Sequence, residues 1–102
     1  MKKILQLLGL GQRARSVVSG DEGVRAKLER RQARLIIIAA DAADSTTRDF
    51  TVLAKRFSVP CLVAETKTDL GAAVGKSPRA VVALLDDNLV NRILELKTPE
   101  DY

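Results

Sequence analysis

Leu35-Ile36-Ile37-Ile38-Ala39 is the stretch around which the fold is predicted to form. Five apolar residues follow one another here, without the alternation of apolar and polar residues seen in a strand with one wet face. Such a run is typical of a strand covered on both faces, so we expect it at the centre of a sheet. Two further apolar runs, at residues 61–64 and 80–85, are predicted to be buried strands of the same sheet.

Helical patterns precede, separate and follow these runs. Apolar residues at helical spacing predict an amphipathic helix at the N-terminus, and Val24 and Leu28 supply a narrow buried stripe for a second. Capping-box spacings, Thr46 with Asp49 and Thr66 with Asp69, predict where two later helices begin. The helices are expected at residues 2–13, 21–31, 46–57 and 66–75, with a last one after a cap at Asp86 or Asp87.

Alternating helices and buried strands define the predicted fold class. Crossover helices between short apolar strands must cover both faces of a sheet. We therefore expect an α/β protein, a three-layer α/β/α sandwich with a small mixed, mostly parallel sheet. At 102 residues, with no linker-like segment, the chain is expected to fold as a single domain over residues 1–102.

Cysteine usage and hydropathy limit the classes of protein that fit. The one cysteine, Cys61, lies in an apolar run and is predicted to be a small buried hydrophobe, so no internal disulfide is expected. The apolar stretch after Lys2 and Lys3 is short and lacks a cleavage pattern, and no run approaches the length of a membrane span. A cytoplasmic location without membrane contact is expected.

Positive charge is concentrated in the first third of the chain. Residues 1–34 hold nine Lys or Arg against three acids, whereas residues 35–102 hold eight against ten. Such asymmetry favours nucleic acid or another acidic partner. With only three aromatic residues in the chain, a stacking platform for single-stranded bases is not expected.

A turn at Gly20 lies within this basic third. Ser19, Gly20 and Asp21 are residue types that start helices, by side-chain capping or by backbone freedom. A helix that begins there would present free N–H groups, which attract phosphate. An ordinary capped surface helix explains the same residues and stays open as an alternative. The cations expected to flank the turn are Arg13, Arg15, Arg25 and Lys27.

Catalytic motifs are weak. Gly75-Lys76-Ser77 resembles the end of a phosphate-binding loop, but the spacing from Gly71 is one residue short, and the motif leaves a helix rather than a strand. Without histidine, catalysis would rest on carboxylates near strand ends, of which the candidates are Asp41, Asp44, Asp86 and Asp87. These aspartates are more simply turn formers and helix caps. No enzymatic activity, cofactor, metal or small-molecule substrate is expected.

Several short motifs in this order and spacing resemble a known family. They are Leu-Leu-Gly-Leu-Gly-Gln-Arg-Ala at 7–14, Val-Val-Ser-Gly at 17–20, Asp-Ala-Ala-Asp-Ser-Thr-Thr at 41–47, Val-Pro at 59–60, Asp-Leu-Gly at 69–71 and Gly-Lys at 75–76. The chain resembles the kink-turn-binding ribosomal-protein family, called L-seven-Ae, and especially its small bacterial YlxQ-like branch. The resemblance covers nearly all of the chain.

The resemblance implies a non-enzymatic, ribosome-associated protein that binds structured RNA with the turn and the start of the second helix. It also implies a second contact from the loop before the last strand, in which Lys76 and Arg79 are the cations expected to reach phosphates. A plain helix-to-strand loop with two solvated cations stays open as the alternative. The family's RNA-reading stretch has Asn, Glu and Lys where this chain has Glu22, Gly23 and Ala26. A carboxylate at Glu22 accepts hydrogen bonds but cannot donate one as Asn does.

Three functions remain from the sequence, the last of them a carboxylate-dependent enzyme acting at the strand ends. The first is binding of structured, kink-turn-like RNA, with ribosomal RNA as one candidate. The second is a protein-interaction module of the same fold that has lost specific RNA recognition. The expected RNA-binding residues are Arg13, Arg15, Ser19, Gly20, Asp21, Glu22, Arg25, Lys27, Lys76 and Arg79.

Overall fold

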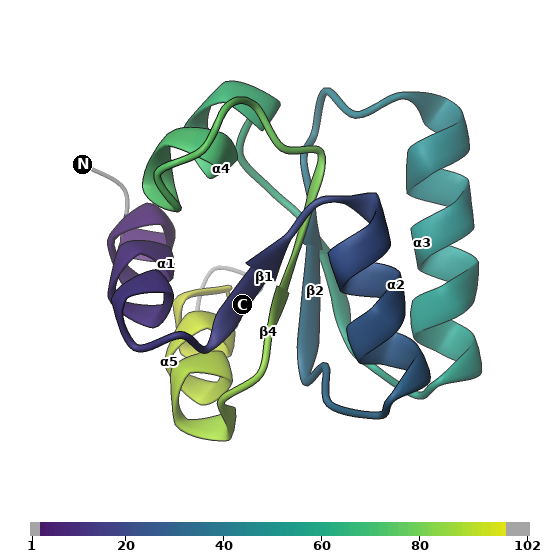
Figure 1. The fold of residues 1–102 in the computed structure, drawn as a ribbon, viewed down its shortest axis with the longest axis horizontal. Coiled ribbons are helices and arrows are strands. Elements are labelled where there is room, and N and C mark those ends of the chain that lie inside the picture. The colour runs from purple at the N-terminus through teal and green to yellow at the C-terminus, as the bar shows by residue number, and fades with distance from the viewer. Residues whose placement is uncertain (1–2, 98–102) are drawn as a thin grey trace.

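In the part of the chain that the structure describes, four strands form one sheet in the order β1-β4-β2-β3 (Figure 1). The computed structural model describes residues 3–97 of the chain. The two central strands, β2 (Leu35–Ile38) and β4 (Val81–Leu84), are buried at every position. The edge strands are β1 (Val17–Ser19) and β3 (Cys61–Val63). The apolar run that begins at Leu35 thus lies inside the sheet, as predicted.

Strand direction differs from the prediction. Only β2 and β3 pair in parallel, while β4 is antiparallel to both of its neighbours, β1 and β2. The sheet is mixed, but the expectation that it is mostly parallel is wrong. An unbroken apolar run indicates that both faces of a strand are covered. It carries no information about direction, and β4 enters between its neighbours from the opposite end.

Within residues 3–97, five helices cover the two faces of the sheet (Figure 1). One face carries α1 (Lys3–Arg13), α4 (Lys67–Ala73) and α5 (Asp87–Lys97). The other carries α2 (Asp21–Glu29) and α3 (Asp44–Arg56). The predicted three-layer α/β/α sandwich is confirmed.

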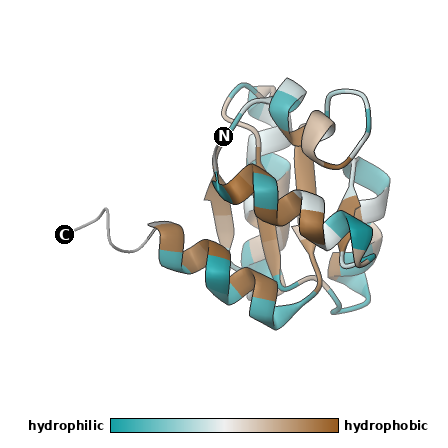
Figure 2. Ribbon diagram, turned by 90° about the vertical axis from the view of Figure 1, so that its left-hand side faces the viewer, coloured by the Kyte–Doolittle hydropathy of each residue, from teal (hydrophilic) through white to brown (hydrophobic). Residues whose placement is uncertain are grey.

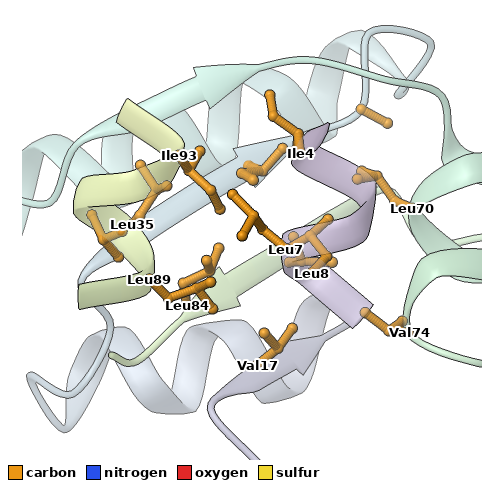
Figure 3. Packing of buried hydrophobic residues seen from close by; sticks show 14 residues of the cluster. Ile4, Leu7, Leu8, Val17, Leu35, Leu70, Val74, Leu84, Leu89 and Ile93 are labelled. Carbon is orange, nitrogen blue, oxygen red and sulfur yellow. The ribbon is translucent and has the colours of Figure 1, made fainter. Parts of the chain in front are cut away.

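Two apolar cores lie on opposite sides of the sheet, because successive strand residues point to opposite faces. Leu35 and Leu84 pack with Leu8, Leu70 and Ile93 beneath α1, α4 and α5 (Figure 3). The neighbouring strand positions pack beneath α2 and α3 in a second cluster that includes Ile36, Ile38, Phe50, Val81 and Ala83. Figure 2 shows the resulting pattern, with brown strands behind helices on which apolar and polar residues alternate.

β3 is less covered than the sequence predicted. It lies at a sheet edge, Cys61 is half-buried, and the Val63 side chain is 54% exposed. Partial burial raises the pKa of the Cys61 thiol, and a hydrogen bond with the Thr51 side chain opposes this rise. The predictions of a doubly covered strand and of a fully buried cysteine are therefore wrong.

Helix starts were predicted with mixed success. Thr66 caps α4 and accepts a hydrogen bond from the Asp69 N–H (3.1 Å), as its spacing predicted. Asp86 accepts one from the Asn88 N–H (2.8 Å) at the start of α5. The capping box at Thr46 and Asp49 is wrong, because α3 already begins at Asp44. An acid in the first turn of a helix is stabilised by the helix dipole, and Asp44 occupies that position.

None of the helices within residues 3–97 is long and apolar enough to cross a membrane.

Candidate nucleic-acid interface

One end of the sheet, called here the Gly20 end, collects most of the residues that the resemblance selected. β1, β2 and β3 finish at this end and β4 begins there, so α2 and α3 start beside each other (top of Figure 1). The loop between α4 and β4, residues 74–80, lies at the same end. Segments far apart in the sequence therefore meet over one edge of the sheet.

Gly20 joins β1 to α2 by backbone geometry alone. Its φ of 91° and ψ of 159° lie in a region that is essentially reserved for glycine. Its N–H donates to the Val81 carbonyl (3.0 Å), and its carbonyl accepts from the Val24 N–H (3.0 Å). No side chain caps α2, and Ser19 lies within β1. Of the two expected ways to start the helix, backbone freedom is the one used.

Gly23 brings α2 close to β1. A Cβ at this position would stand 2.6 Å from Cγ1 of Val18, closer than real Cβ atoms approach a neighbour. Gly23 stands where the family's RNA-reading stretch has Glu, and in this chain it has a packing role. It keeps the first turn of α2 against the edge strand.

The loop before β4 is held tightly to α4. Gly75, with φ of 70°, ends the helix in a Schellman arrangement, in which Lys76 N–H donates to Gly71 O (2.8 Å) and Gly75 N–H to Ala72 O (3.1 Å). A Cβ on Gly71 would collide with the carbonyl group of Ser77 and stand 2.8 Å from the Cα of Pro78. The glycines first compared with a phosphate-binding loop thus fix the path of this loop.

Arg79 links the loop to the Gly20 turn. Its guanidinium donates to the Oγ of Ser77 (2.7 Å) and to the carbonyls of Ser77 and Pro78 (3.2 and 3.3 Å). Its Cδ and Nε each lie 3.9 Å from the place where a Cβ on Gly20 would stand. Lys76 is exposed on the same loop. The structure therefore places the Arg79 side chain beside the Gly20 turn.

Arg25 and Lys27 lie further along α2. Arg25 faces α3, where its Nη2 is 3.9 Å from Oδ2 of Asp49 and its Cζ is 5.0 Å from the centre of the Phe50 ring. Lys27 donates to Oε1 of Gln32 (3.1 Å), beyond the end of the helix. Both side chains contact neighbours in their own fold, and neither lies within 4 Å of the site of a Gly20 Cβ.

Arg13 and Arg15 are not brought to the turn. Arg13 ends α1 and Arg15 lies in the connection that precedes β1, whereas Gly20 follows β1 (Figure 1). The strand stands between them, so neighbours in sequence lie at opposite ends of the sheet. The expectation that these arginines flank the Gly20 turn is wrong.

Charge at the Gly20 end is correspondingly low. Asp21 and Glu22 are exposed in the first turn of α2. In the turns and first helical residues at this end, six carboxylates accompany three cations; the carboxylates are Asp21, Glu22, Asp41, Asp44, Glu65 and Asp69, and the cations are Lys67, Lys76 and Arg79. The positive ends of the helix dipoles offset only part of this excess.

Lys67 is a residue of this end that the sequence analysis did not select. Its N–H donates to Oδ1 of Asp41 (2.8 Å), and its carbonyl accepts from the Arg79 N–H (3.0 Å). It therefore ties the β2–α3 turn to the loop before β4. The Thr66–Asp69 capping box was the available signal, because it makes Lys67 the first helical residue.

The candidate carboxylates do not form one site. Asp41 and Asp44 follow β2, whereas Asp86 and Asp87 follow β4, which runs the other way. The two pairs therefore lie at opposite ends of the sheet. Within residues 3–97 no group of three or more Cys, Asp or Glu side chains is placed to hold a metal ion.

Solved structures of similar fold come from distant organisms. A protein of unknown function from Bacillus halodurans C superposes with a TM-score of 0.89 at 30% identity, over 94% of this chain and 97% of that one. The Giardia lamblia 15.5kD RNA binding protein gives a TM-score of 0.76 at 26% identity, over 93% and 85% of the two chains.

Relatives by sequence carry one name. RNA-binding protein YlxQ of Bacillus subtilis (strain 168) is 36% identical over 90 residues, which are 88% of this chain and 90% of that protein. RNA-binding protein YlxQ of Enterococcus faecium is 26% identical over 95 residues, 93% and 91% of the two chains. A model of the ribosomal protein L7Ae/L30e/S12e/Gadd45 family matches residues 2–94, and the chain therefore belongs to this family.

Proposed function

We propose that this protein is a small, non-enzymatic RNA-binding protein that docks structured, kink-turn-like RNA at its Gly20 end, in association with the ribosome in the cytoplasm. Residues 1–102 act as one RNA-binding domain in this proposal. The similar proteins named for RNA binding in Bacillus subtilis, Enterococcus faecium and Giardia lamblia support RNA as the partner.

One observation carries the choice of surface. The Gly20 turn and Arg79, which are 59 positions apart, approach within 3.9 Å, measured from Arg79 Cδ to the site of a Gly20 Cβ. The resemblance assigns RNA contacts to the same two segments. A rigid turn beside a rigid loop suits recognition of shape, with Arg79 and Lys76 donating to phosphates.

Each candidate residue has a different part in this mechanism. Gly20 and its neighbours Ser19, Asp21 and Glu22 form the surface on which a bent backbone rests. Lys76 is exposed and free to reach a phosphate, while Ser77 holds the Arg79 guanidinium in place. Arg25 acts mainly through its contacts with α3.

The experiment compares a kink-turn RNA with a plain RNA duplex of equal length by mobility shift across a salt series. The wild-type protein is expected to prefer the kink-turn RNA. The variant Lys76→Ala/Arg79→Ala should bind it about tenfold more weakly, a loss of ~1.4 kcal/mol, because two phosphate donors are removed. Lys3→Ala/Arg92→Ala, on α1 and α5, removes the same charge and is the control.

Other results would change the proposal in defined ways. Equal binding of both RNAs would remove kink-turn recognition and leave a binder driven by phosphate contacts. No binding of either RNA would favour the second candidate, a protein-interaction module. The six carboxylates at the Gly20 end are the observation that supports this candidate. A thermal unfolding curve of each variant shows whether weaker binding comes from the removed side chains or from an unfolded protein.

A further inference from the structure

The end of the sheet opposite Gly20 gathers cations from two adjacent helices. α2 and α3 pack side by side and finish there, and β2 begins there (Figure 1). Five exposed cations stand on the last turns of these helices and on the residues that lead into the strand. This group, called here the basic end, consists of Arg30, Arg31, Arg34, Lys55 and Arg56.

Contacts across the two helix ends hold the group together. The Cζ of Arg31 lies 5.5 Å from the centre of the Phe57 ring, so the guanidinium covers an aromatic face from the next helix. A cavity of about 300 Å³ lies alongside, and its lining includes Arg31, Arg34, Phe57, Ser58 and Pro60. The basic end therefore combines charge with a hollow lined partly by apolar atoms.

The positive charge exceeds what the fold itself requires. Arg13 and Arg15, which precede β1, bring the exposed cations at this end to seven, and the acids are three: Glu29, Asp86 and Asp87. Asp87 pairs with Arg34, whose Nε lies 3.6 Å from its Oδ1. The C-termini of α2 and α3 contribute roughly −0.5 each. About three positive charges remain uncompensated, whereas the Gly20 end has more acids than cations.

We propose that the basic end is a second RNA contact, which binds the phosphodiester backbone of an RNA segment other than the one at the Gly20 end. This inference rests on the proposed function. The guanidinium groups donate planar, paired N–H groups that match phosphate oxygens. The Gly20 end then recognises RNA shape, while the basic end supplies most of the attraction that depends on salt.

The arrangement gives one chain two RNA contacts. The described residues extend 31 × 29 × 26 Å, and the two contacts lie at opposite ends of the strands. In this proposal the two contacts take different segments of one folded RNA. The protein would hold two parts of a folded RNA in a fixed relation.

The test uses Arg30→Gln/Arg56→Gln, because these exposed side chains make no ion pair or hydrogen bond with other residues of the range 3–97. Lys3→Gln/Arg92→Gln is the control with the same change in net charge. Binding of the kink-turn RNA and of the plain RNA duplex is measured across a salt series. The slope of log K against log salt is negative, and removing one cation that binds a phosphate makes it shallower by roughly 0.7–0.9. The magnitude of the slope should therefore be smaller by about 1.5 in the basic-end variant.

Stoichiometry at low salt provides a second measurement. The wild-type protein should bind two short RNA duplexes, and Arg30→Gln/Arg56→Gln should bind one. If the slope and the stoichiometry of this variant equal those of the control, the second contact is refuted, while the Gly20 proposal stands if Lys76→Ala/Arg79→Ala still weakens binding. If the wild-type protein binds no RNA, the proposed function and this inference fall together.

Discussion

At Gly20 the φ and ψ angles are accessible to glycine and strained for every residue with a Cβ. Gly20→Ala is expected to lower the free energy of unfolding by about 1–3 kcal/mol. A clash is not the cause, since the added Cβ would stand 3.9 Å from the nearest Arg79 atoms, an ordinary contact. Urea denaturation followed by circular dichroism measures the change.

Gly9→Ala is the matched control for this prediction. Gly9 lies within α1, without a positive φ, and its added Cβ would stand 3.5 Å from the Ala73 carbonyl oxygen. Alanine is the better helix former by roughly 1 kcal/mol, so this variant should be slightly more stable than the wild-type protein. Equal stability of Gly20→Ala and the wild-type protein would contradict the strain argument.

At the scale of the elements, the capping-box spacing in the sequence predicts one helix start correctly and another wrongly. The Thr66–Asp69 pair and the Thr46–Asp49 pair have the same spacing, but only Thr66 caps a helix, because α3 begins before Thr46. Thr66→Ala should lower the free energy of unfolding by about 1 kcal/mol. Thr46→Ala should change it by less than ~0.5 kcal/mol, since it removes no cap.

Thermal or urea unfolding of the two variants checks this prediction. Equal changes in stability would mean that the hydrogen bond from the Asp69 N–H to the Thr66 hydroxyl adds nothing to the stability of α4. The comparison also has a functional readout. α4 carries the loop with Lys76 and Arg79, so Thr66→Ala should weaken RNA binding slightly if that loop makes the proposed contact.

Burial could be predicted from sequence, but strand direction could not. The buried runs around Ile37 and Val82 and the stripe at Val24 and Leu28 appear in the structure as predicted. These features depend on local hydrophobic patterns. Direction depends on which strand pairs with which, and β4 joins two strands that precede it by more than 40 residues.

At the scale of the whole molecule, the candidate site was predicted only in part. The family resemblance selected Gly20 and Arg79, which the fold brings together. The charge pattern selected Arg13 and Arg15 by their closeness in sequence, and the short strand β1 separates them from Gly20. A cluster of charges along the sequence therefore predicts a basic surface only when no strand lies within the cluster and carries its members to opposite ends of the sheet.

The sheet also separates two apolar cores, which are expected to contribute independently to the free energy of unfolding. Val81 and Val82 are adjacent and fully buried, but they belong to the cores on opposite faces. Val24 lies in the same core as Val81, and Gly20 connects their backbones by hydrogen bonds to both. Mutations that share packing partners couple, whereas those separated by the sheet should act independently.

A double-mutant cycle measures this division. Each of Val24→Ala, Val81→Ala and Val82→Ala should cost roughly 1–3 kcal/mol of the free energy of unfolding, from urea denaturation. The effects of Val24→Ala and Val82→Ala should add to within about 0.5 kcal/mol, while Val24→Ala and Val81→Ala should depart from additivity by more than that. Equal coupling in the two pairs would mean that the cores respond as one. The RNA contact proposed at the Gly20 end would then depend on the packing under α1, α4 and α5 as much as on that under α2.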